Sequence, residues 1–467
     1  MTVKTVIAPT DIGAGLKISG AKVIIDSGYF APETMIRRSS KIGLKATLVA
    51  NATAILTLNA PLTYAWTGAG VTFGTASAAT TTVVATTPGE YSVTCTVTDA
   101  DGQAFVETHR LKLDRVLEVG GADGEVNDRL ATLQAAFNWI NTNDGANASS
   151  YLIVVVGVTS DASRIVPNGA RVHFQSGGQI PVGVDFPAGT FYWSGAGKEW
   201  IAINAGSGAG IAFSAVATLY LQNVGVKAVG TGSASALRTG VITGCTVNLQ
   251  DCYFETANGS CVSLGGGTFN VKGCYCVAVA GGQAFACGTA TVYIDGLEAR
   301  AGMGYSAVYL PDVTGVVSGV RAFASTNGST VVRTFHINML ATDGLTLVVK
   351  DCLAVLTGAT SAAAIASAFL FEGTGNRQVY LVNCTGFAVA AWALIRLSTA
   401  AAGNWNVINC VLVGANAGAV LSNLNATTLA TTAWNPARIY NTVFRGTLSG
   451  PITFTAGTVQ TGENIIM

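Results

Sequence analysis

The stretch from Leu249 to Cys274, LQDCYFETANGSCVSLGGGTFNVKGC, begins and ends with the same four-residue phrase. The phrase is an apolar residue, a variable residue, then Asn, Asp or Gly, then a small and mostly apolar residue. It occurs nine times in the C-terminal half, with its third position at Asn223, Asp251, Gly273, Gly296, Gly319, Asp351, Asn383, Asn409 and Asn441. These positions are 22 to 32 residues apart, which is the period of a solenoid.

The residue types at the third position explain how such a period can fold. Asn, Asp and Gly tolerate positive φ, so each copy can form a tight bend while the flanking apolar residues point into a core. The repeat therefore predicts a right-handed parallel β-helix, an all-β fold. The composition agrees, because 467 residues with 50% apolar residues, 56 Gly and only 11% charged residues do not suit amphipathic helices. About ten coils would form a rod on the order of 50 Å long.

The charge and hydropathy of the sequence argue against nucleic acid and membranes as partners. The chain has 25 basic and 25 acidic side chains and a formal net charge of zero, so neither nucleic acid nor an anionic membrane surface is expected to bind. The N-terminal residues MTVKTVIAPTDIG do not resemble an export signal, and the sequence has no continuous apolar run of membrane-spanning length. We expect synthesis in a cytoplasm, no membrane partner and no cofactor.

Cysteine usage predicts buried thiols. Five cysteines share the fourth position of the repeated phrase and would form an interior column: Cys252, Cys274, Cys352, Cys384 and Cys410. Cys274 and Cys276 would share one face of a strand, but no CxxC or Cys/His pattern accompanies them. The sequence therefore predicts free thiols and no metal site.

The N-terminal part has a different pattern. We expect residues 1–41 to form an attachment arm and residues 42–116 to form a sandwich of short alternating strands. Tyr64 and Trp66, the run Pro88 to Val93 (PGEYSV) and the turn Thr98 to Gly102 (TDADG) resemble the polycystic-kidney-disease (PKD) type of immunoglobulin-like domain. The usual Gly-Asp-Gly after the Trp is absent here. The resemblance implies a spacer or an adhesive module.

Residues 117–149 are predicted to be a linker and a helix. Asn127 or Asp128 could cap that helix, and its apolar residues Leu130, Leu133, Ala136, Phe137 and Ile140 are spaced three and four apart. A helix in this place, followed by coils over 150–467, resembles the start of pectin-lyase-like β-helices found in phage tailspikes and in polysaccharide-degrading enzymes. The resemblance implies that the helix caps the open end of the solenoid.

Glycan cleavage on this scaffold would need two nearby carboxylates, or acids with a basic group. Asp295, Glu298 and Arg300 are the best catalytic candidates, because residues two apart on a strand share a face and a neighbouring bend can add a third group. Asp251 and Asp351 occupy bend positions, where a carboxylate commonly binds nearby backbone. The three histidines occupy different segments and suggest no catalytic triad.

Aromatic residues near the first coils are candidates for glycan binding. Tyr192, Trp193 and Trp200 could stack on sugar rings, although such a cluster also suits a loop or subunit contact.

The sequence favours a structural protein of a bacteriophage virion, either a tailspike-like fibre or a capsid decoration protein, with its solenoid exposed to host surface glycans. The arm would bind other virion proteins, and the resemblance to tailspikes implies a homotrimer. Two alternatives remain open: a polysaccharide depolymerase, acting as a glycoside hydrolase or lyase, and a bacterial surface adhesin or sheath protein.

Overall fold

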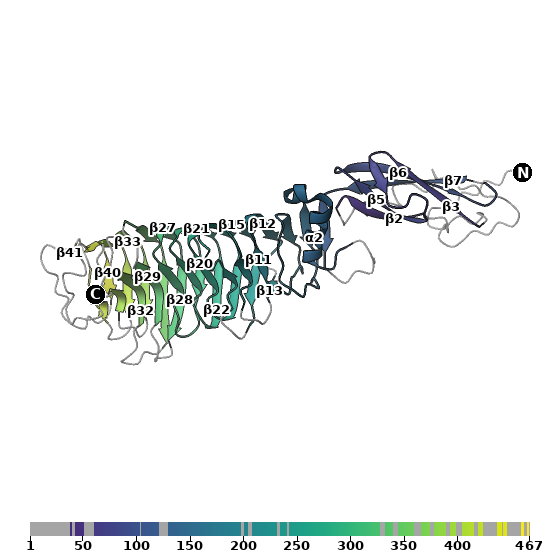
Figure 1. The fold of residues 1–467 in the computed structure, drawn as a ribbon. Helices are drawn as coiled ribbons and strands as arrows, with labels where there is room; N and C mark the ends of the chain where they lie inside the picture. The colour runs from purple at the N-terminus through teal and green to yellow at the C-terminus, as the bar shows by residue number, and fades with distance from the viewer. Residues whose placement is uncertain are drawn as a thin grey trace, which may run out of the picture. The chain divides into compact units, whose positions relative to one another are not determined.

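The computed structural model divides into two units, residues 1–116 and residues 117–467 (Figure 1). It describes residues 38–39, 43–50, 60–102, 104–120, 129–197, 200–203, 208–230, 234–240, 242–326, 332–339, 344–358, 366–373, 378–388, 393–397, 404–414, 419–423, 437–440, 442–445, 459–461 and 465–466.

The first unit contains two small sheets. One consists of β1 (Arg38–Ser39), β7 (Ala104–Leu113), β6 (Gly89–Thr98) and β3 (Thr63–Gly68), and the other of β2 (Lys45–Val49), β5 (Thr80–Ala85) and β4 (Val71–Phe73). β1 pairs with β7, so the end of the expected arm belongs to this unit. The remaining pairings are antiparallel.

Trp66 and Cys95 are at the centre of the first unit. They are paired residues on β3 and β6, both are buried, and the Trp66 indole N–H donates to the Ala78 carbonyl at 2.9 Å. Burial, and then the charge of Glu107, raises the pKa of the Cys95 thiol to about 11. Apolar packing therefore holds this unit together, without a disulfide among its described residues.

The second unit is a solenoid in which, from β11 onward, successive strands join three parallel sheets in turn. Sheet 1 consists of β11 (Val184–Phe186), β14 (Ile211–Phe213), β17 (Leu237–Arg238), β20 (Val262–Gly265), β23 (Phe285–Gly288), β26 (Val308–Pro311), β29 (Val332–Met339), β32 (Ala366–Gly373), β35 (Ala393–Leu397) and β38 (Ala419–Asn423).

Sheet 2 follows sheet 1 in each coil. It consists of β8 (Val116–Val119), β9 (Leu152–Val155), β10 (Arg171–Phe174), β12 (Gly189–Gly195), β15 (Ala217–Gln222), β18 (Cys245–Gln250), β21 (Gly267–Lys272), β24 (Thr291–Asp295), β27 (Thr314–Ser318), β30 (Thr346–Lys350), β33 (Gln378–Val382), β36 (Asn404–Ile408), β39 (Ala437–Tyr440) and β41 (Val459–Thr461).

Sheet 3 completes the coil. It consists of β13 (Trp200–Ile203), β16 (Gly225–Ala228), β19 (Tyr253–Asn258), β22 (Tyr275–Gly281), β25 (Glu298–Arg300), β28 (Arg321–Thr326), β31 (Leu353–Gly358), β34 (Thr385–Ala388), β37 (Val411–Gly414), β40 (Val443–Arg445) and β42 (Ile465–Ile466). Figure 1 shows these strands stacked coil upon coil, so the parallel β-helix predicted from the repeat is the fold of this unit.

The repeated phrase forms the bend between sheet 2 and sheet 3. Its third position has φ between 52° and 74° in every described copy, namely Asn223, Asp251, Gly273, Gly296, Gly319, Asp351, Asn383 and Asn409. The ninth position, Asn441, lies outside the described residues. Neighbouring bends are also hydrogen-bonded, because Asn383 Nδ2 donates to Asp351 Oδ1 at 3.2 Å. The bend residues thus form a row along the stack of coils.

The residue after each bend points into the core. Cys252, Cys274, Cys352, Cys384 and Cys410 are all buried, as predicted, and all ten cysteines are free. Each of these five thiols lies near a backbone carbonyl; Cys252 Sγ, for example, donates to the Leu221 carbonyl at 3.2 Å. No group of three or more His, Cys, Asp or Glu among the described residues is arranged to hold a metal ion.

We expect these thiols to react slowly in the folded protein. Burial raises the pKa of Cys276 and Cys287, and both the higher pKa and the lack of access suppress the reactive thiolate. Titration with a thiol reagent should therefore detect few or no cysteines in the native chain and all ten after denaturation. Rapid labelling of Cys252 or Cys384 in the native protein would contradict the inward orientation.

Helix α2 (Leu133–Asp144), followed by the 3-10 helix η3 (Gly145–Ser150), lies at the end of the solenoid where the coils begin (Figure 1). Leu133, Ala136, Phe137 and Ile140 are buried in the same core as the first strands, as expected from their spacing. Leu130 lies before the helix and forms a bridge with Val119 instead. None of the described helices is long and apolar enough to cross a membrane.

The start of α2 differs from the sequence prediction. Thr132, rather than Asn127 or Asp128, is the N-cap, and its side chain accepts a hydrogen bond from the Ala135 N–H at 3.0 Å. The buried carboxylate of Asp161 accepts two more, from the Leu133 N–H at 2.8 Å and the Gln134 N–H at 3.1 Å. A negative charge at this end of a helix is favourable, so Asp161 fixes α2 onto the first coil.

Candidate functional site

Sheet 3 carries a cluster of charged and aromatic side chains on its outer face. Glu298 binds Arg300 at 2.8 Å, and Arg321 on the next strand lies 3.8 Å from the same carboxylate. The Arg300 guanidinium lies over the rings of Tyr275, 5.8 Å away, and Phe323, 4.8 Å away. The hydrogen bond that Arg300 donates to the Glu298 carboxylate raises the pKa of Arg300. Glu298 is therefore bound to cations on its own strand and on the next.

The same face continues toward the earlier coils. Tyr253 stacks on Tyr275 with ring centroids 5.1 Å apart, and its hydroxyl donates to Glu255 at 3.1 Å. Glu255 also binds Lys227 at 2.7 Å. Burial, together with the hydrogen bond to Glu255, raises the pKa of Tyr253. Each carboxylate of this cluster thus has its own cationic partner.

The three predicted catalytic residues lie on the two sides of one bend. Asp295 is the last residue of a sheet 2 strand and accepts a hydrogen bond from Ser318 Oγ at 3.2 Å. Glu298 begins the sheet 3 strand on the other side of the bend at Gly296. Glu298 binds Arg300, whereas Asp295 binds Ser318.

Glu255 and Glu298 lie on neighbouring parts of sheet 3, and each carboxylate is held by its own cation. β19 pairs with β22, which pairs with β25, and Glu255 is in register with Arg300 rather than with Glu298. Two strand spacings and a two-residue offset put their Cα atoms about 12 Å apart.

The acids at the bends have structural partners. Asp351 accepts from Asn383 Nδ2 at 3.2 Å, and Asp251 accepts from Gln250 Nε2 at 3.2 Å. Both partners are side-chain amides rather than the nearby backbone expected from the sequence.

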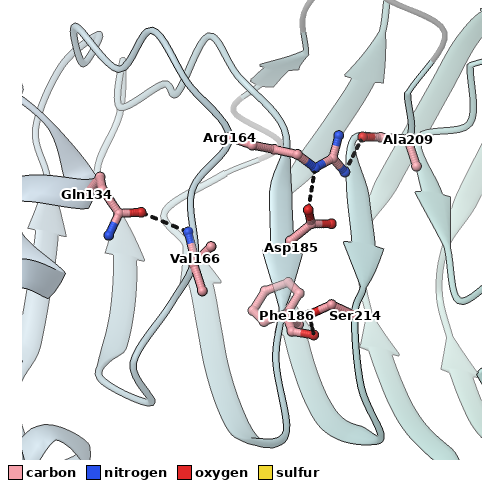
Figure 2. Close-up of polar contacts among 7 residues, drawn as sticks. All are labelled: Gln134, Arg164, Val166, Asp185, Phe186, Ala209 and Ser214. Carbon is pink, nitrogen blue, oxygen red and sulfur yellow. Dashed lines mark hydrogen bonds and ion pairs between the residues drawn. The ribbon is translucent and has the colours of Figure 1, made fainter.

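A polar network joins the first coils to α2 (Figure 2). Arg164 binds Asp185 at 2.8 Å and donates to the Ala209 carbonyl at 2.9 Å, while Gln134 of α2 accepts from the Val166 N–H at 2.8 Å. One arginine therefore contacts two consecutive strand regions of sheet 1. The network fixes loops and coils to each other, and its one carboxylate, Asp185, is held by a cation.

The predicted aromatic site is corrected by the structure. Trp193 is only 1% exposed, and its ring lies 5.8 Å from Phe174 and 5.1 Å from Phe186, so it is a core residue and cannot stack on a ligand. Tyr192 has the opposite orientation: it is 47% exposed and stacks on Tyr220 with ring centroids 4.7 Å apart. The side chain of Trp200 lies outside the described residues.

Tyr192 belongs to a regular outer face of sheet 2 that sequence reasoning missed. One in-register column consists of Tyr192, Tyr220, Asn248, Asn270, Tyr293, Val316, Val348 and Tyr380. Beside it runs a column of threonines, Thr190, Thr218, Thr246, Thr268, Thr291, Thr314 and Thr346. From Thr218 onward each threonine is five residues before a bend residue, a signal present in the sequence.

Comparisons with known proteins assign this chain to no family. No family model matches the chain, and no curated protein matches it. Among solved structures, the structure of Yersinia enterocolitica family 28 exopolygalacturonase is similar over 83% of this chain and 85% of that chain, with 11% sequence identity and a TM-score of 0.27. A TM-score this low is no evidence of a shared activity.

Proposed function

We propose that this chain is a structural protein of a bacteriophage virion, a tailspike-like fibre or capsid decoration protein, whose solenoid contacts host surface glycans without cleaving them. The observation that supports the absence of cleavage is that the candidate carboxylates already have partners within the chain. Asp185, Glu255 and Glu298 each bind a cationic side chain, and the other candidate, Asp295, accepts a hydrogen bond from Ser318. A free acid–base pair is what hydrolysis or elimination would require.

The parts of the chain have matching roles in this proposal. Residues 1–41 would bind other virion proteins, and the first unit would be an immunoglobulin-like, PKD-like spacer, which its two sheets and the buried Trp66 support. Helix α2 would cap the first coil, which its buried apolar side supports. The solenoid would associate as a homotrimer at the virion surface.

The enzymatic alternative is tested with the purified full-length chain. We expect no new reducing ends and no unsaturated uronic products after incubation with capsule and lipopolysaccharide from candidate hosts, and we expect Glu298→Gln to behave identically. Cleavage that disappears in Glu298→Gln or Asp295→Asn would replace this proposal with a depolymerase.

The location is tested separately by imaging. A label directed at this chain should decorate purified phage particles. Label on uninfected bacterial cells instead would favour the surface adhesin or sheath protein.

A further inference from the structure

The buried cysteines that follow the bends lie on consecutive coils. Cys252 and Cys274 are neighbours on adjacent coils, because the tyrosines directly after them are a registered pair of β19 and β22. The pairing of β31 with β34, and of β34 with β37, stacks three more cysteines in the same way. The five cysteines therefore form a pair and a group of three, namely Cys252 with Cys274, and Cys352 with Cys384 and Cys410.

The sulfur atoms in these two groups share one orientation. Each Sγ lies between 3.1 and 3.4 Å from the backbone carbonyl oxygen two residues before it. Side chains with the same orientation on neighbouring parallel strands are displaced by one strand spacing, about 4.8 Å. Neighbouring thiols also interact, because a hydrogen bond between Cys252 and Cys274 raises the pKa of Cys274. The sulfurs of each group thus form a row along the stack of coils.

This spacing does not suit a disulfide. A disulfide joins sulfurs about 2.0 Å apart and needs Cβ atoms about 3.8 Å apart. Side chains stacked in register keep their Cβ atoms about one strand spacing apart, about 4.8 Å. Oxidation would therefore require the coils to move toward each other, and the thiols of the structure are free.

A cation between two of the sulfurs does fit. A metal–thiolate bond is about 2.3 Å long for Zn²⁺, so an ion held in a line between two sulfurs spans about 4.6 Å. Zn²⁺ and iron–sulfur clusters need about four ligands, and no group of three or more His, Cys, Asp or Glu in the described part of the chain is arranged to hold a metal. Cu(I) is a soft cation that thiolates select, and it accepts two sulfur ligands in a line.

The charges of such a site balance inside the apolar core. A Cu(I) ion that binds two thiols displaces one proton, so one cysteine becomes a thiolate and the other remains a thiol. The charges of the ion and the thiolate cancel, which avoids burying a net charge. The remaining S–H keeps a backbone acceptor; for Cys252 these are the carbonyls of Leu221 and Gln250, both at 3.2 Å.

We propose that each group of stacked cysteines binds one Cu(I) ion between two neighbouring sulfurs and so joins two coils. In the first group the ligands are Cys252 and Cys274, and in the second Cys384 provides one sulfur and an adjacent cysteine the other. The site is independent of the proposed function. The sequence argument against a metal concerned CxxC and Cys/His spacings, not cysteines that the fold stacks. Because the thiols are buried, the ion enters while the coils assemble.

The test measures the metal content of the full-length chain, produced with and without added copper and purified without oxygen. We expect about two copper ions per chain after growth with copper, one for each group, and no zinc. Cys384→Ala should lose one ion, because it leaves Cys352 and Cys410 two coils apart. Cys410→Ala is the matched control: it removes a thiol from the same group but leaves Cys352 beside Cys384, so it should retain both ions.

X-ray absorption of the copper-loaded wild-type chain gives a second measurement that needs no variant. We expect two sulfur neighbours for each copper ion. The inference is overturned if the folded chain retains no copper or takes up zinc instead, or if each copper has three or more sulfur ligands. Equal copper content in folded Cys384→Ala and Cys410→Ala would also overturn it, since binding would then not depend on neighbouring thiols.

Discussion

Phe137→Ala will lower the free energy of unfolding by about 3 to 5 kcal/mol. Phe137 is fully buried on α2, in one core with Leu133 and Ile140 and with the first strands of the solenoid. Alanine removes most of that apolar contact and leaves a cavity between the helix and the first coil. The helix does not move to fill this cavity, because Asp161 binds the N–H of Leu133 at its start. Chemical denaturation followed by circular dichroism measures the change.

Thr142→Ala is the control for this variant. Thr142 is exposed on the same helix, so its replacement should change stability by no more than about 0.5 kcal/mol. A Phe137→Ala protein as stable as Thr142→Ala would show that α2 does not pack on the first coil. A loss of several kcal/mol in both variants would instead point to the helix itself rather than its buried face.

The fold could be predicted because one local requirement repeats. From β15 to β36, each described bend between sheets 2 and 3 has a residue of positive φ, and only Asn, Asp and Gly adopt it at low cost, so Asn223 and its equivalents mark these coils in the sequence. The same phrase predicts that the next residue is buried, which holds for Cys252 and the four cysteines equivalent to it.

Contacts between residues distant in the sequence could not be predicted in this way. Asp161 caps α2 from 28 residues beyond Leu133, and nothing in the sequence around α2 indicates it. The partners of the candidate acids could not be predicted either. Asp295 accepts from Ser318, 23 residues later in the sequence, and Arg321 on the next strand lies near Glu298.

The inward orientation of Trp193 was missed because alternation along a strand gives orientations only when one residue is already known to point inward or outward. In the stretch Phe191-Tyr192-Trp193 every residue is aromatic, so either alternation of inward and outward side chains would place aromatic residues in the core. The first copy of the repeated phrase comes only at Leu221, one coil later. Pairing of Trp193 with Leu221 fixes the alternation, but that register is a property of the folded chain.

Trp193→Ala is accordingly expected to destabilise the solenoid by about 3 to 5 kcal/mol, although its neighbour Tyr192 can be replaced at little cost. Trp193 packs against Phe174 on the preceding strand of its sheet and Phe186 on sheet 1, so its removal opens a large cavity in the second and third coils. Tyr192→Ala removes an exposed ring that stacks only on Tyr220 among the described aromatic contacts, and should cost no more than about 1 kcal/mol.

Trp193→Phe separates packing from hydrogen bonding. The Trp193 indole N–H has no hydrogen-bond acceptor in the part of the chain that the structure describes, so phenylalanine retains much of the ring packing and removes a buried donor without a partner. Its loss of stability should therefore be clearly smaller than that of Trp193→Ala in the same denaturation experiment. If Tyr192→Ala proved the more damaging of the two alanine variants, the inward and outward assignments of β12 would be reversed.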